Sequence, residues 1–128
     1  MPVQDILAPI SLGELIDKIT ILQIKSQKLQ NTAQENVKKE LEALETTLNN
    51  LQLNVNPSLI QRLKKINQDL WDIEDQIRDQ ESQCNFGETF ILLARSVYKK
   101  NDQRAAIKKE INITYGSALT EEKSYQKY

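Results

Sequence analysis

The spacing of apolar residues is the feature that most limits how this chain can fold. In four separate segments, apolar side chains recur every three or four residues, which places them along one face of an α-helix. The third segment shows this most clearly, with a stripe made of Leu59, Leu63, Ile66, Leu70, Ile73 and Ile77. Such a helix is stable only when its stripe packs against another element. The sequence therefore predicts an all-α protein whose helices share one core.

Start and stop signals give the bounds of these helices. A capping signal precedes each of the segments: Ser11 with Glu14, Thr32 with Glu35, Asn56 before Pro57, and Asn85 with Glu88, the last weakened by Gly87. Gly116 is a natural C-terminal stop, because glycine tolerates the left-handed conformation that ends many helices. We predict helices at about residues 12–30, 33–52, 57–83 and 86–115.

The connections between the predicted helices hold only a few residues, so consecutive helices must be antiparallel neighbours. The simplest arrangement is an antiparallel up-down-up-down four-helix bundle with left-handed, coiled-coil-like packing. Residues 1–128 then form a single helical-bundle domain. Ile21 and Ile24 lie off the main stripe of the first helix, which makes that helix apolar on two sides. It is therefore either central in the bundle or part of an oligomer contact.

The segments outside the four helices differ in character. Val3, Ile6, Leu7 and Ile10 make the N-terminal segment apolar, so we expect it to lie extended across the bundle rather than apart from it. The C-terminal tail "SALTEEKSYQKY" (residues 117–128) is polar and has no apolar stripe. The tail is either disordered or docked onto the bundle, and its composition is compatible with both.

Composition excludes several classes of function. The chain has no histidine, so Ser-His-Asp and Cys-His catalysis and His-ligated zinc or di-iron sites are excluded. Its 17 basic and 18 acidic residues give a net charge of −1, which argues against nucleic-acid binding. No apolar run is long enough to span a membrane, and we predict no signal peptide. We expect a soluble, cytoplasmic protein with no cofactor and no metal.

An acidic run in the third predicted helix lies opposite basic residues of the fourth. Antiparallel neighbours place Asp69, Asp72 and Asp75 near Arg95 and Lys100. One interpretation is a ladder of surface ion pairs, and the alternative is a carboxylate metal site. The ladder is favoured, because nothing in the sequence forces the acids to converge on one point.

Arg104 stands on the apolar stripe of the fourth predicted helix, with apolar turns on both sides. A buried guanidinium needs a carboxylate or a bound anion, because an unpaired buried charge is very costly. Asp17, Glu40 and Asp69 can reach the same layer of the bundle. One hypothesis is a buried ion pair that fixes the register of the helices. The other is an arginine that anchors a ligand.

One end of the bundle is expected to be electropositive. The fourth helix brings Arg104 and Lys108 there, opposite basic residues of the third helix. Helix N-termini add partial positive charge, so this end is a candidate anion site. The candidate ligand-binding residues are Arg104, Lys108, Asn101, Lys18 and Asp17. Trp71 flanks the third stripe and is interpreted as a core-edge residue, with a ligand platform as the alternative.

Four blocks carry a resemblance to a known family. They are "PISLGELIDKITILQIK" (residues 9–25), "LWDIEDQIRD" (residues 70–79), "FILLARSVYKKNDQRAAIKKEIN" (residues 90–112) and "GSALTEEKSY" (residues 116–125). In these blocks the chain resembles small, uncharacterised, all-helical bacterial and phage proteins, a domain of unknown function. The resemblance implies no specific activity. It does imply an association with surface-polysaccharide pathways and a tail that folds back onto the bundle.

The sequence supports two hypotheses about function. The first is a non-enzymatic helical interaction protein that forms a homo-oligomer or binds a protein partner, because the first helix is apolar on two sides. The alternative is a small-molecule binding protein or enzyme that holds an anionic ligand at the basic end around Arg104. Nucleic-acid binding there is not expected, because no aromatic residue is interleaved with the cations.

Overall fold

Four helices make up the structure, a computed structural model that describes residues 2–128. They are α1 (Leu12–Lys28), α2 (Asn31–Asn50), α3 (Pro57–Ser82) and α4 (Glu88–Thr114). The predicted all-α, four-helix fold is confirmed, and each predicted bound agrees with the observed one to within two residues. None of the helices within residues 2–128 is long and apolar enough to cross a membrane.

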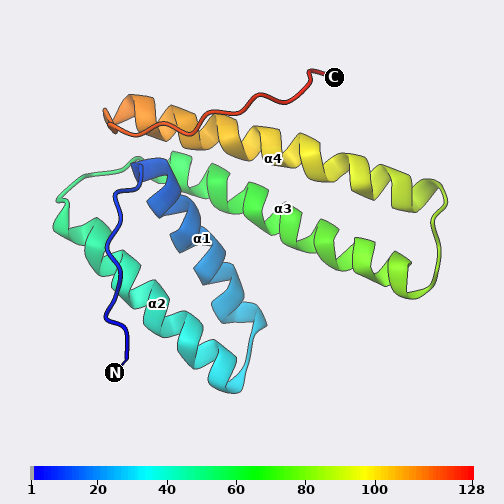
Figure 1. Cartoon of the computed structure of the whole chain (residues 1–128), viewed down its shortest axis with the longest axis horizontal. Helices are drawn as coiled ribbons and strands as arrows, with labels where there is room; N and C mark the ends of the chain where they lie inside the picture. The colour runs from blue at the N-terminus through cyan, green and yellow to red at the C-terminus, as the bar shows by residue number, and fades with distance from the viewer. Residues whose placement is uncertain (1) are drawn as a thin grey trace.

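The helix α1 is central. It packs against α2, α3 and α4, whereas the backbone of α2 approaches that of α1 alone within the described residues. Figure 1 shows two helical hairpins, α1–α2 and α3–α4, and the far half of the α3–α4 hairpin extends beyond α1. The central position explains why the sequence of α1 is apolar on two sides, because α2 covers one side and the α3–α4 hairpin covers the other.

Two of the four predicted caps are present. Ser11 Oγ accepts from the Glu14 amide at 3.1 Å, and Asn56 Oδ1 accepts from the Ser58 amide at 2.9 Å. The predicted cap at Thr32 is wrong, because α2 already begins at Asn31 and has no side-chain cap. The predicted cap at Asn85 is also wrong, because Gly87 directly precedes α4 and no side chain caps that helix. The turn before α2 is fixed instead by Gln34, which donates to the backbone oxygen of Ser26 at 2.8 Å.

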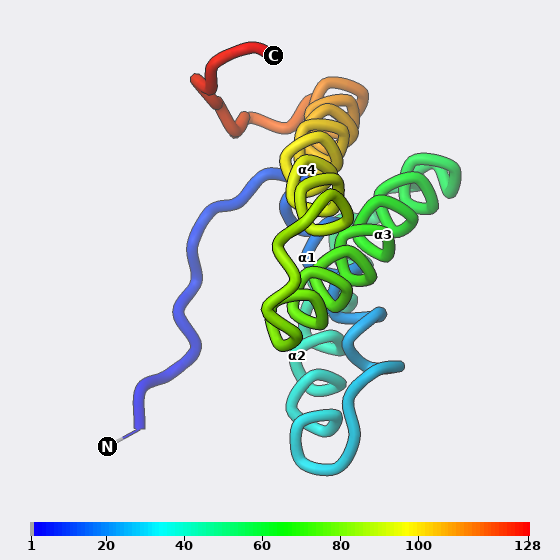
Figure 2. Tube along the Cα trace, turned by 90° about the vertical axis from the view of Figure 1, so that its right-hand side faces the viewer, coloured from blue at the N-terminus to red at the C-terminus, as the bar shows by residue number. Residues whose placement is uncertain are grey.

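The N-terminal segment does not lie across the bundle, and that expectation is wrong. Val3, Ile6 and Leu7 are 84%, 83% and 93% exposed. Figure 2 shows this segment running away from the helices. The apolar sides of α1 are already covered by other helices, so they are not available to this segment.

The C-terminal tail docks onto α4, along which it runs in Figure 1. Tyr128 Oη donates to Asp102 at 2.5 Å, and the Tyr128 ring packs edge-on against Tyr98 with centroids 5.1 Å apart. At the start of the tail, Ser117 Oγ accepts from the Leu12 amide at 3.1 Å. The tail therefore also contacts the first turn of α1.

The core lies where α1 begins and α4 ends. Its buried residues are Leu12 and Ile16 from α1, Leu59, Leu63 and Ile66 from α3, and Ile107 and Ile111 from α4. No side chain of α4 before Ile107 is buried. The far half of the α3–α4 hairpin is thus much less covered than the half that contacts α1.

Gly13 lets α1 and α4 come very close together. Its amide donates to Asn112 Oδ1 at 2.7 Å. A Cβ at this position would lie 2.5 Å from the backbone oxygen of Lys108 and 3.0 Å from Asn112 Oδ1. No side chain fits there unless the two helices move apart.

We predict that Gly13→Ala lowers the free energy of unfolding by about 1–3 kcal/mol, because the added methyl meets backbone rather than a flexible side chain. Chemical denaturation with circular dichroism measures the change. Gly87→Ala is the matched control, since a Cβ there meets only Asn85 Oδ1, at 3.5 Å. Equal effects of the two substitutions would contradict the prediction.

Candidate functional site

An ion pair between Asp17 of α1 and Arg104 of α4 lies at the centre of the candidate site. Arg104 Nε donates to Asp17 Oδ1 at 2.9 Å, and Nη2 donates to Oδ2, so the pair is bidentate. Asp17 is completely buried, whereas the Arg104 side chain is 29% exposed. Of the three acids expected to reach Arg104, Asp17 is the one that pairs with it.

A third helix fixes the buried carboxylate. Asn67 of α3 donates from Nδ2 to Asp17 Oδ1 and to Thr20 Oγ1, both at 2.9 Å. Thr20 in turn donates to the backbone oxygen of Asp17 at 2.8 Å. Sequence reasoning missed Asn67, although an amide beside the apolar stripe of α3, next to Ile66, was the available signal. Asp17 therefore ties α1 to both α3 and α4.

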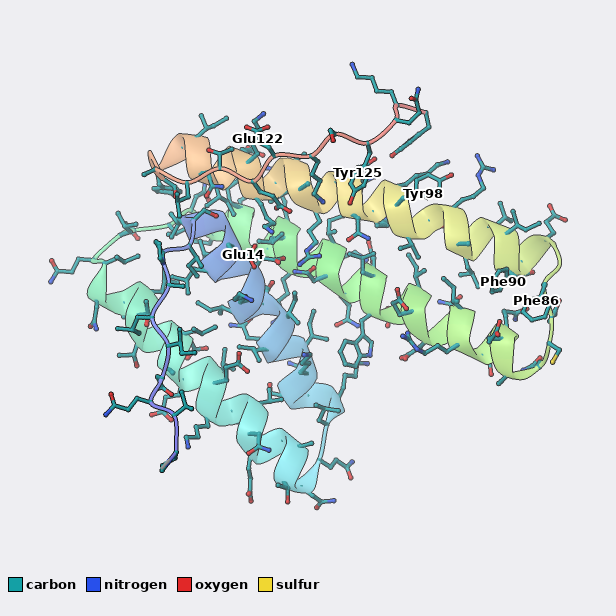
Figure 3. All side chains as sticks on the ribbon, viewed as in Figure 1. Glu14, Phe86, Phe90, Tyr98, Glu122 and Tyr125 are labelled. Carbon is teal, nitrogen blue, oxygen red and sulfur yellow. The ribbon has the colours of Figure 1, made fainter. Side chains whose placement is uncertain are left out.

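Lys108 extends this charged cluster to the C-terminal tail. Its side chain is only 8% exposed, and Nζ contacts Glu14 at 2.7 Å, Glu121 at 3.0 Å and Asp17 at 3.9 Å. Glu14 follows the start of α1 (Figure 3), and Glu121 comes from the tail. One buried ammonium thus holds the beginning of α1 and the tail against α4.

The expected electropositive end is not present, and this expectation needs correction. Arg104 and Lys108 are neutralised by Glu14, Asp17 and Glu121. On the neighbouring surface, Arg62 pairs with Glu110 at 2.9 Å. The basic end was expected from the facing residues of α3 and α4 alone, whereas most of the compensating acids come from α1 and from the tail.

Burial and pairing act in opposite directions on the acids of the cluster. Burial raises the pKa of Asp17, but hydrogen bonds from Arg104 and Asn67 outweigh it, so the pKa lies below its ordinary value of 3.8. The hydrogen bond from Lys108 lowers the pKa of Glu14 below its ordinary value of 4.5. Both carboxyl groups are therefore ionised at neutral pH.

Burial and hydrogen bonding also shift the pKa of the cation Lys108 in opposite directions. Burial disfavours its ammonium, but hydrogen bonds to Glu14 and Glu121 outweigh burial and raise the pKa of Lys108 above its ordinary value. The cation that joins α1, α4 and the tail is thus charged over the whole physiological range of pH.

The other sequence candidates lie around this cluster. Lys18 is half exposed and contacts Glu14 at 3.6 Å, so it belongs to the rim of the cluster. Lys100 pairs with Asp69 at 3.1 Å, but the rest of the predicted ladder between α3 and α4 does not form within residues 2–128, because Asp72, Asp75 and Arg95 take part in no ion pair there. Asn101 lies on α4, at a cleft that Arg104 also lines.

This cleft has a volume of about 460 Å³ and lies between α1, α3 and α4. Ile21, Ile24 and Leu70 contribute apolar surface to its walls. Its aromatic and polar lining includes Asn67, Trp71, Glu74, Asp75, Arg78, Asn101 and Arg104. Trp71 is half-buried, so the indole lies at the edge of the core and at the same time forms part of the cleft.

A comparison with family models matches residues 6–128 to a family described as a family of unknown function, DUF6165. The chain belongs to this family. A search of curated proteins found no match. A search of solved structures also found none.

In this DUF6165 chain, the cleft gathers residues from three of the blocks on which the resemblance rests. Trp71, Asp75 and Arg78 come from the block at residues 70–79, and Asn101 and Arg104 come from the block at residues 90–112. The block at residues 9–25 contributes part of the apolar wall and the buried Asp17 behind Arg104. Within residues 2–128, no three Cys, Asp or Glu side chains group in a way that could hold a metal ion.

We predict that Asp17→Asn lowers the free energy of unfolding by about 3 kcal/mol, because it leaves Arg104 partly buried without its counter-charge. Urea denaturation measures the loss. Glu110→Gln is the control, since it breaks a half-exposed pair with Arg62 and should cost about 0–1 kcal/mol. A loss for Asp17→Asn no larger than for the control would show that the buried pair does not stabilise the fold.

We also predict that the protein loses stability in acid. The folded-state pKa values of Asp17 and Glu14 lie below their ordinary values, so their contribution is complete above the ordinary values of 3.8 and 4.5. That contribution is lost as the pH falls through the lowered folded-state values. Urea titrations between about pH 2.5 and pH 7 should show a stability plateau above about pH 5 and a decline below it. The decline should be smaller in Asp17→Asn, and an equal decline would contradict the assignment.

Proposed function

We propose that the protein binds a small, hydroxyl-rich ligand of the sugar type in the cleft between α1, α3 and α4. The observation that carries this proposal is that Trp71 lines the cleft together with planar polar side chains, among them Asp75, Asn101 and Arg104. A sugar ring has an apolar face of C–H groups that packs on an aromatic ring. Its hydroxyl groups bond well to carboxylate, amide and guanidinium groups, which present paired donors or acceptors in one plane.

Arg104 is held ready for such a ligand. Asp17 accepts from Nε and Nη2, and no other side chain within residues 2–128 accepts from this guanidinium. Its remaining N–H groups are available at the cleft that it lines. Because Asp17 fixes the guanidinium in advance, little side-chain freedom is lost when a ligand binds.

The charges around the cleft favour a ligand with little or no charge. The cations Lys25, Arg78 and Arg104 face the acids Glu74 and Asp75, and the buried Asp17 compensates Arg104. Arg78 is also paired with Glu74 at 2.6 Å. The anionic ligand expected from a basic end of the bundle is thus less well supported than a neutral sugar. A sugar ligand agrees with the association with surface-polysaccharide pathways that the family resemblance implies.

We predict that neutral monosaccharides or short oligosaccharides change the fluorescence of the protein in a saturable way. Trp71 is the only tryptophan, so the emission reports on the cleft directly. Asp75→Asn and Asn101→Ala should each weaken binding about tenfold, which corresponds to about 1.4 kcal/mol per lost hydrogen bond to the ligand. A thermal-shift assay provides a second measurement that does not depend on Trp71.

Lys39→Ala is the matched control, because Lys39 is exposed on α2 and α2 does not line the cleft. The Lys39→Ala variant should bind the sugar with the same affinity as the unaltered protein. The proposal would be wrong if no neutral sugar gave a saturable response. It would also be wrong if only charged sugars bound and did so equally well in Asp75→Asn.

We propose self-association as a second function. The far end of the α3–α4 hairpin favours it, because Phe86, Ile91 and Leu92 are each about half exposed there. Figure 3 shows Phe86 and Phe90 at this end, away from α1 and α2. The apolar sides of α1 that first suggested an oligomer are covered within the chain, so a contact between copies has to use another surface.

A further inference from the structure

We propose that two copies of the chain pair through the far halves of their α3–α4 hairpins, with both tips at the same end. We call this far half the arm, which comprises residues 72–99. The inference rests on the proposed self-association and assigns it a surface, a partner and a geometry. The partner is a second copy of this chain.

The arm lacks the packing layer that amphipathic helices need. Ile73 is its only buried residue, and no residue of the arm within α4 is buried. Figure 1 shows that the arm extends past the ends of α1 and α2. Apart from the contact of Tyr98 with the tail and the cleft beside α1, the two helices of the arm have only each other to pack on and leave apolar surface in water, for which a second pair of helices is a common solution.

The tip of the arm exposes large apolar side chains close together. The rings of Phe86 and Phe90 pack edge-on with centroids 5.4 Å apart, although Phe86 remains 52% exposed. Ile91 and Leu92 on the first turn of α4 are 53% and 52% exposed. Pairing of two tips at the same end would bring these side chains together with their counterparts and remove them from water.

The two helices of the arm carry opposite charges. The α3 side has Asp72, Asp75 and Asp79, and the α4 side has Arg95 and Lys99. All five are exposed, and none takes part in an ion pair within residues 2–128. The arm thus offers an acidic edge and a basic edge whose charges are still unpaired.

This charge pattern selects one two-fold arrangement of the copies. When two arms stack, an axis that runs along the arms is the one that places α3 of each copy against α4 of the other. Adjacent helices are then antiparallel, as in a four-helix bundle. The other two-fold axes place like helices together, so that acidic edge meets acidic edge or basic edge meets basic edge.

In this arrangement the opposite charges of the two copies also lie at matching heights along the helices. Within one chain, the pairs Asp69–Lys100 and Arg62–Glu110 mark which residues of α3 and α4 stand at the same height. Residue numbers at one height therefore sum to between 169 and 172.

Two pairs of unpaired charges satisfy this relation across the contact. Asp72 stands level with Lys99 of the partner subunit, and Asp75, which lies at the border between the cleft and the arm, stands level with Arg95 of the partner subunit. The two-fold axis repeats both pairs, so four ion pairs flank the contact.

The experiment measures the mass of the protein by sedimentation equilibrium between about 10 μM and 1 mM, because an arm of this size makes a small, weak interface. The unaltered protein should change from monomer to dimer over this range. Arg95→Glu with Lys99→Glu should weaken the dimer at least about tenfold, because four attractive contacts become repulsive. Combining these with Asp72→Lys and Asp75→Lys should restore the dimer, since the edges are then complementary again.

Lys38→Glu with Lys39→Glu is the matched control, because it makes the same change of charge on exposed residues of α2. It should leave the dimer unchanged, and circular dichroism should show that every variant retains its helices. A monomer at all concentrations would overturn self-association together with the arm pairing. A dimer that resists the Arg95 and Lys99 reversal, or is not restored by the four changes together, would overturn the arm pairing and leave self-association standing.

Discussion

The arrangement of the helices depends on the buried ion pair between Asp17 and Arg104. A carboxylate with no exposure to solvent is tolerated only when donors surround it. Arg104 supplies donors from α4, and Asn67 supplies one from α3. The first half of α1 is therefore fixed against both helices of the second hairpin. The same region holds the closest approach of two helices, at Gly13, where the backbones leave no room for a side chain.

The interaction that holds α1 in place also shapes the candidate site. Asp17 lies behind Arg104 and fixes the plane of its guanidinium, while the partly exposed side of Arg104 lines the cleft with Trp71 and Asn101. Stability and the proposed ligand recognition thus involve the same pair of residues. This arrangement is economical in entropy, because a guanidinium that is already fixed loses little freedom on binding.

The two ends of the α3–α4 hairpin differ in how much surface is covered. Near the end of α4, Ile107 and Ile111 are buried under α1, and the tail adds Glu121 to the ammonium of Lys108. At the other end no side chain of α4 is buried, and Phe86 is half exposed. The apolar stripe runs along the whole hairpin, but other parts of the chain cover it at one end only. We therefore assign the far end to contacts between copies.

The sequence by itself determined the four helices and the presence of a charge that needed a partner. Apolar spacing and the caps at Ser11 and Asn56 act over a few residues, so they can be recognised locally, and Arg104 on an apolar stripe implied a partner of opposite charge, either a carboxylate or a bound anion. The tertiary structure decided which acid pairs with Arg104, that the Glu14 carboxylate pairs with Lys108, and that a cleft opens beside Trp71. It also decided that the N-terminal segment stays apart and that no basic end forms. These outcomes depend on how helices cross and on what lies across the crossing, and the periodicity of a single helix carries no information about its neighbours.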